Sequence, residues 1–134
     1  MTATANQQTV TTGEHKDAAT RFLELASRGD VRRAFDTYVA PNFRHHNPYF
    51  PGDAQSLADA MEQNARENPD KSLVVERAIE DGNLVAVHSR VRLKPDGPQV
   101  AVVHVLRFEG DRIAELWDVG QPVPPESPNE HGMF

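Results

Sequence analysis

Apolar residues recur at helical spacing in three segments of the first half of the chain. In the first segment they fall three and four residues apart, and Arg28-Gly29 is typical of a helix end. Asp30 and Asp53 are typical N-cap residues for the two segments that follow. Residues 42–52 are rich in Pro and Asn, which predicts a short extended piece and then a loop. The pattern therefore predicts helices over residues 14–28, 30–40 and 53–68.

From Lys71 the apolar positions alternate with polar ones, which is typical of β-strands. Asp81-Gly82 is a strong hairpin signal, and Gly110-Asp111 marks a further turn. The pattern predicts strands over residues 71–80, 84–93, 99–109 and 112–119. Three helices followed by a four-stranded antiparallel meander predict an α+β fold in which the helices cover one face of the sheet.

Composition and charge narrow the classes of function. The 134 residues suffice for one domain, predicted over residues 14–120, with a flexible leader over 1–13 and a Pro-rich tail over 121–134 that packs on the domain or a partner. The net charge of −6 argues against nucleic acid or an anionic membrane as the partner. The absence of cysteine excludes disulfides and thiolate chemistry. The chain shows neither a secretory signal nor a membrane-length apolar run, so we expect a cytoplasmic protein.

His104 and Asp118 are the first candidates for chemistry. His104 lies in the middle of a strand that is apolar on both faces, so we expect it to be buried; the plain alternative is a core histidine satisfied by a neighbour. A three-residue hairpin loop over 109–111 would put both side chains on one face as diagonal neighbours, whereas a two-residue loop would put them on opposite faces. We favour the three-residue loop, because three apolar residues then share that face: Leu106, Ala114 and Leu116.

The other histidines are weaker candidates. His45 and His46 alternate sides if the chain is extended there, so only one of them points inward. His88 shares a strand face with Arg90, which fits a clamp for a substrate carbonyl or carboxylate and fits a solvated or salt-bridged surface equally well. Four residues have suitable chemistry for zinc or iron but no local ligand spacing, so we predict no metal site: His46, His88, His104 and Asp118.

Several segments, taken in their order, resemble the SnoaL-like polyketide cyclase family. They are the run from Tyr38 through His46-Asn47-Pro48, the strand over residues 103–109, and residues 113–119 followed by Gln121-Pro122-Val123-Pro124. The ending Gly132-Met133-Phe134 is similar to the close of a small bacterial "predicted aldol-condensation" branch. The resemblance covers residues 14–134. It implies a nuclear-transport-factor-2-like fold, an α+β roll of the cystatin-like kind, in which a cone-shaped, curved antiparallel sheet packs against three N-terminal helices around a pocket.

The resemblance also implies an acid/base aspartate that needs no metal, Schiff base or cofactor, and this role would fall on Asp118. We therefore expect a lyase or isomerase of aldol-condensation or cyclase type, in which His104, His46 or Tyr49 donates to the enolate oxygen of a small carbonyl compound. The alternative is a non-catalytic module of the same fold that binds a small ligand or serves in assembly. The candidate substrate-binding residues are Tyr38, Asn47, Tyr49, His88 and Arg90.

The outer face of the sheet is predicted to be a homodimer interface. On that face we place Val103, Val105 and Trp117, and from the neighbouring strand Val85, Val87, Val91 and Leu93. So large an apolar patch is unusual on a soluble monomer. The alternative is that the leader and the tail fold back over it.

Overall fold

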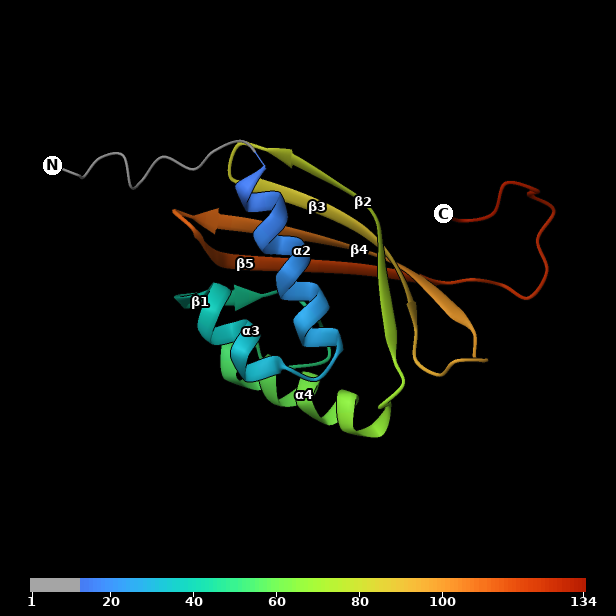
Figure 1. Cartoon of the computed structure of the whole chain (residues 1–134), viewed down its shortest axis with the longest axis horizontal. Coiled ribbons are helices and arrows are strands. Elements are labelled where there is room, and N and C mark those ends of the chain that lie inside the picture. The colour runs from blue at the N-terminus through green and yellow to red at the C-terminus, as the bar shows by residue number, and fades with distance from the viewer. Residues whose placement is uncertain (1–12) are drawn as a thin grey trace, which may run out of the picture.

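Three helices lie on one face of a curved five-stranded sheet in the computed structural model, which describes residues 13–134 (Figure 1). The predicted leader lies outside the described residues, apart from Gly13. The helices are α2 (Glu14–Ser27), α3 (Val31–Tyr38) and α4 (Ala54–Glu67). The strands are β1 (Val39–His45), β2 (Ser72–Asp81), β3 (Leu84–Arg92), β4 (Gln99–Glu109) and β5 (Arg112–Pro122). This is the α+β fold class that the sequence predicts.

The sheet has one strand more than the meander that the sequence predicts. Its order is β1-β5-β4-β3-β2, and the four long strands pair antiparallel as expected. The second helix ends at Tyr38, before the predicted end, and the chain continues as β1, which pairs parallel with β5. The sheet is therefore mixed, because the segment interpreted as a short extended piece and a loop adds a strand at its edge.

The predicted helix ends are confirmed where the sequence carries a clear signal. The carboxylate of Asp53 accepts a hydrogen bond from the backbone N–H of Ser56 at 2.9 Å and so caps α4. Gly29 follows α2 with φ of 94°, a left-handed conformation that glycine adopts without steric cost. These two features fix where α2 ends and where α4 begins.

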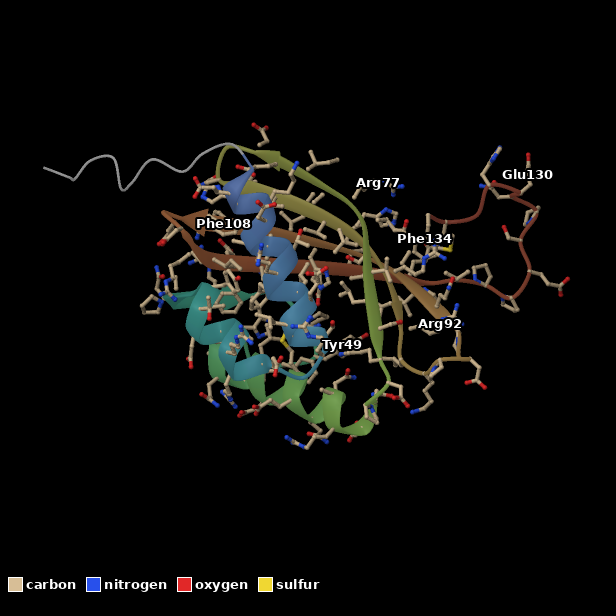
Figure 2. All side chains as sticks on the ribbon, in the orientation of Figure 1. Tyr49, Arg77, Arg92, Phe108, Glu130 and Phe134 are labelled. Atoms are coloured by element: carbon tan, nitrogen blue, oxygen red, sulfur yellow. The ribbon has the colours of Figure 1, made fainter. Side chains whose placement is uncertain are left out.

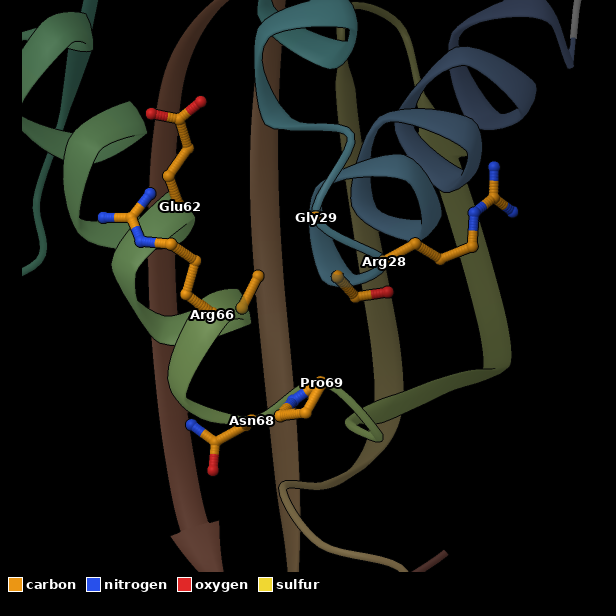
Figure 3. A pocket seen from close by; sticks show the side chains of 8 residues that line it. Arg28, Gly29, Glu62, Arg66, Asn68 and Pro69 are labelled. Atoms are coloured by element: carbon orange, nitrogen blue, oxygen red, sulfur yellow. The ribbon is translucent and has the colours of Figure 1, made fainter.

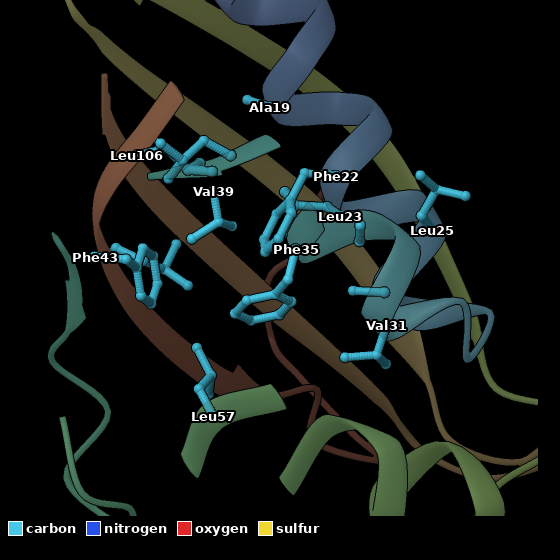
Figure 4. Close-up of a cluster of buried hydrophobic side chains, with 14 of the residues drawn as sticks. Ala19, Phe22, Leu23, Leu25, Val31, Phe35, Val39, Phe43, Leu57 and Leu106 are labelled. Atoms are coloured by element: carbon cyan, nitrogen blue, oxygen red, sulfur yellow. The ribbon is translucent and has the colours of Figure 1, made fainter. Parts of the chain in front are cut away.

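The hydrophobic core fills the space between the helices and the inner face of the sheet (Figure 4). Phe22 of α2, with no exposed surface, packs edge-on against Phe35 of α3, with ring centroids 5.4 Å apart. Val85 and Val87 belong to this core and are fully buried, so their predicted place on the outer face is wrong. The alternation along β3 is correct, but its apolar side faces the helices.

The outer face of the sheet is more polar than predicted, and the tail reaches it. The ring of Phe134 stacks on His88 with centroids 5.8 Å apart, and the guanidinium carbon of Arg90 lies 4.1 Å from the centre of the same ring (Figure 2). Val103 and Val119 remain exposed on this face, by 39% and 72%. None of the helices in residues 13–134 is both long enough and apolar enough to span a bilayer.

Candidate functional site

His104 and Asp118 stand directly opposite each other on β4 and β5. The hairpin has the two-residue turn Gly110-Asp111, since Glu109 pairs with Arg112, so the predicted three-residue loop is wrong. The register then shifts by one residue between Arg107 and Phe108, at a β-bulge that restores the parity. The expected shared face is therefore present, with the two residues as direct partners instead of diagonal neighbours.

Both side chains line a cavity of about 220 Å³ between the sheet and the ends of α2 and α4. Apolar side chains make up much of its wall, and Lys71 is the basic residue in its lining. The cavity is smaller than the roughly 300–1,000 Å³ of pockets that hold drug-sized ligands. The lining residues are Leu23, Ala26, Ser27, Met61, Lys71, Leu73, Val91, Val102, His104 and Asp118.

His104 is a neutral imidazole at neutral pH. Burial lowers its pKa to about 4, and the negative charge of Asp118 offsets this only in part. Its Nδ1 atom is buried and has no hydrogen-bond partner. We assign the ring proton to Nε2, because a buried N–H without an acceptor is costly. His104 thus offers a neutral N–H donor on the side of the ring that retains accessible surface.

Asp118 is held by a single hydrogen bond. The side-chain amide of Asn47 donates to its Oδ2 at 3.1 Å, and Oδ1 has no hydrogen-bond partner among the described residues. The amide of Asn47 is itself oriented, because its Oδ1 accepts the backbone N–H of Tyr49 at 3.0 Å. One carboxylate oxygen is therefore fixed, and the other is free for a proton.

His45 anchors the loop that presents Asn47, a role that the sequence analysis does not assign. The buried ring of His45 donates from Nε2 to the carbonyl of Pro51 at 2.6 Å and accepts the backbone N–H of Asn47 at Nδ1, at 3.1 Å. Only one of the two adjacent histidines points inward, as expected, and that one is His45. The two hydrogen bonds of the His45 ring hold the loop over residues 46–51 in place.

His46 lies on the outer face of the sheet, so it cannot donate to a substrate in this cavity. Its ring stacks on Trp117 with centroids 4.9 Å apart, and its Nε2 lies 2.6 Å from the carboxylate of Glu115. Glu115 also accepts hydrogen bonds from the guanidinium groups of Arg44 and Arg107 at 3.0 Å. These donors lower the pKa of Glu115 to about 2. This cluster braces β1, β4 and β5 from outside.

The other predicted substrate-binding residues also lie away from the cavity. His88 and Arg90 contact Phe134 on the outer face, and Arg90 donates to Glu76 at 2.8 Å. Tyr38 lines a separate hollow beside α2, and Tyr49 is 84% exposed. Of that predicted group, Asn47 alone reaches the site, through Asp118.

The four suggested metal ligands do not converge. Two of them, His46 and His88, lie on the outer face, whereas His104 and Asp118 lie inside. Within residues 13–134, no three side chains of His, Cys, Asp or Glu form a group that could hold a metal ion. The histidines of this chain are thus distributed over both faces of the sheet.

Lys71 is a charged cavity residue that does not stand out in the sequence. It precedes β2 and stands two residues before Leu73, which faces the same cavity. The period-two alternation therefore contains the signal, since residues 71 and 73 share a face in an extended chain.

Comparison with known proteins agrees with this fold. The family model of the SnoaL-like domain matches residues 19–116, most of the chain, so the chain belongs to the SnoaL-like domain family. A search of curated protein sequences finds no match. Solved structures do match in fold, and the resemblance seen in the sequence is confirmed.

Three of these structures illustrate the likeness. TsrD from Streptomyces laurentii is 19% identical, with a TM-score of 0.69 over 84% of this chain and 92% of that one. AclR from Streptomyces galilaeus, a candidate hydroxylase, is 19% identical, with a TM-score of 0.70 over 83% and 91%. A candidate polyketide cyclase from Acidithiobacillus ferrooxidans is 20% identical, with a TM-score of 0.68 over 84% and 92%. At these identities the likeness establishes a shared fold.

Proposed function

We propose that the chain is a cofactor-independent lyase or isomerase that removes a proton next to the carbonyl of a small compound, with Asp118 as the base. The proposal rests on the surroundings of the Asp118 carboxylate, namely its access to the cavity and its few hydrogen bonds. Asp118 lines an open cavity and accepts one hydrogen bond, from Asn47, whereas a purely structural carboxylate would be enclosed by donors. Membership of the SnoaL-like domain family supports the same class of reaction.

The proposed step moves one proton and one electron pair. Oδ1 of Asp118 takes a proton from the carbon next to the carbonyl, and the C–H electrons form a carbon–carbon double bond as the carbonyl π electrons move onto oxygen. A carboxylate is a weak base for a carbon acid, so the oxygen needs stabilisation. The neutral Nε2–H of His104 supplies it as a hydrogen-bond donor. In an unsaturated compound the conjugated enolate takes the proton back from Asp118 at the far end of the conjugated system, which is an isomerisation. Alternatively, the enolate carbon attacks a second carbonyl carbon, and the alkoxide that forms takes the proton back from Asp118, which is an aldol closure.

Exchange with solvent deuterium tests the first step without knowledge of the natural substrate. Small ketones and oxo acids are incubated with the protein in deuterium oxide, and the loss of the proton signal next to the carbonyl is followed by NMR. Asp118→Asn should reduce exchange by about 100-fold or more, since general-base catalysis contributes about 10²–10⁴-fold. The control is Asp111→Asn, which changes an exposed carboxylate in the turn of the same hairpin.

Exchange that persists in Asp118→Asn would remove this residue from the role of base. A wild-type protein that binds such compounds and exchanges none of them would favour the non-catalytic binding module.

We also propose that two copies of the chain associate through the outer face of the sheet. The exposed valines Val103 and Val119 support this, because β-branched side chains in water on a sheet face are favourable to cover. Trp117, stacked under His46, continues the patch. An isologous two-fold dimer is the simplest closed arrangement.

We further propose that the protein is located in the cytoplasm. The main support for this location is the lack of cysteine in the chain.

A further inference from the structure

Lys71 is the basic residue in the lining of the cavity that holds His104 and Asp118. Its position is fixed at two points, because its backbone N–H donates to the carbonyl of Asn68 at 3.1 Å and its Nζ donates to Oδ1 of Asn64 at 2.6 Å. An ammonium group has three donors, and this contact uses one of them. Two donors of this ammonium group therefore have no partner among the described residues.

The charge of Lys71 has no counter-charge in direct contact. The one hydrogen-bond partner of its Nζ atom in the described part of the chain is the neutral amide of Asn64, and no carboxylate there forms an ion pair with this ammonium group. Burial lowers the pKa of this ammonium, and no acidic neighbour counteracts that effect. A partly desolvated cation without a partner is costly, so an anionic group placed beside it gains more than it would in water.

The surface next to the cavity carries cations as well. A second hollow of about 270 Å³ lies between the ends of α2 and α4 and shares Ser27 with the cavity (Figure 3). Arg28 and Arg66 contribute to its lining. Arg28 lies 4.0 Å from the carboxylate of Asp30, and the acidic member of the lining, Glu62, is paired with Arg32 at 2.9 Å. Arg66 is therefore the basic lining residue without an ion pair in the described part of the chain, and its charge favours the approach of an anion.

We propose that the ligand of the cavity is a small carbonyl compound that carries a carboxylate, and that Lys71 binds this carboxylate. The carbonyl part of this assignment rests on the function proposed for Asp118 and His104, whereas the carboxylate part rests on Lys71. The cavity volume of about 220 Å³ fits a short oxo acid. Lys71 is then the residue that selects oxo acids over neutral ketones.

Two probes of similar length separate charge from shape: levulinate, a ketone with a carboxylate, and 2-hexanone, a neutral ketone. Binding of each is measured by NMR titration of the labelled protein. Lys71→Met should weaken levulinate binding about 10- to 100-fold, the range for one lost hydrogen bond to a charged group. The binding of 2-hexanone should stay within about twofold, because no charge is lost for a neutral ligand. Lys71→Arg keeps the charge and should retain most of the levulinate affinity.

Lys94→Met is the matched control. Like Lys71, Lys94 donates from Nζ to an asparagine side chain, in this case Oδ1 of Asn68 at 3.1 Å, but it does not line the cavity. Its loss should leave the binding of both probes unchanged.

The inference is overturned if Lys71→Met weakens both probes equally, if the wild-type protein prefers 2-hexanone, or if levulinate shows no saturable binding at millimolar concentrations. Failure of the proposed function looks different. In that case levulinate binds in a manner that depends on Lys71, but neither the wild-type protein nor Asp118→Asn exchanges its protons. The two proposals therefore succeed or fail on separate measurements.

Discussion

Acidification should destabilise the fold through His104. The unfolded chain takes up a proton on this imidazole near its ordinary pKa of 6.5, whereas the folded protein resists protonation until the pH reaches about 4. Between these values the unfolded state binds more protons than the folded state, so the free energy of unfolding falls as the pH is lowered. The contribution is complete above pH 6.5 and is lost progressively towards pH 4.

The size of this effect follows from the difference between the two pKa values. At about 1.4 kcal/mol per pKa unit, the interval from 6.5 to about 4 corresponds to a loss of about 3 kcal/mol. This is a large share of the roughly 5–15 kcal/mol that stabilises a typical domain. His104→Gln keeps a polar side chain at this position and removes the titration, so the variant should lack this component of the pH dependence.

Urea unfolding at a series of pH values from 6.5 to 4 measures the effect as the difference between wild type and His104→Gln. His131→Gln is the control, because the side chain of His131 is 85% exposed in the tail and its removal should leave the curve unchanged. Parallel curves for wild type and His104→Gln would refute the reasoning. Such a result would mean that the imidazole is solvated and protonates at an ordinary pH, and the neutral donor proposed for the reaction would be lost with it.

Two further predictions concern the support of Asp118 and the assembly. Asn47→Ala should slow deuterium exchange about tenfold without unfolding the protein, because Asp118 loses the hydrogen bond that orients it. Asn42→Ala is the control, since Asn42 lies in β1, before the loop that carries Asn47, and it should have no effect. Equal rates in both variants would contradict this positioning role. In sedimentation at micromolar concentration the protein should run near twice 14.9 kDa, and Val119→Lys should release monomers by placing a charge in the proposed interface. A wild-type monomer, or dimers that survive the substitution, would place the contact elsewhere or nowhere.

The pairing of His104 with Asp118 shows how far strand alternation reaches in this chain. The alternation of side chains along a strand predicts whether both residues share a face only when the hairpin turn and the strand pairing are known. The turn has two residues, and the bulge beside Arg107 then compensates for it. Ile113 and Ala114 are both buried although they are adjacent, because the bulge leaves Ala114 on β5 without a partner on β4. The local sequence specifies neither this bulge nor the strand β1 that pairs with the other edge of β5.

The same missing strand explains the error at the two adjacent histidines. Alternation correctly predicts that one of them points inward, but the phase is set by the pairing of His45 with Leu116 across β1 and β5. A segment interpreted as a loop has no such phase, so the sequence offered no physical reason to prefer His45 over His46. The fold class, in contrast, follows from long periodic segments, whose burial requirement is independent of any single register.

The cavity lies where the side chains on one face of α2 become smaller. Phe22 and Ala26 are four residues apart and therefore lie on the same face of the helix. Phe22 is completely buried in the core, whereas the smaller side chains of Ala26 and the neighbouring Ser27 line the cavity. Along β4 the inner face changes in step, from fully buried Leu106 to His104 at the cavity wall. The interface between α2 and the sheet thus opens into a cavity where its side chains become too small to fill the space. The alternation of side chains along β4 and β5 then places the imidazole of His104 and the carboxylate of Asp118 at this cavity.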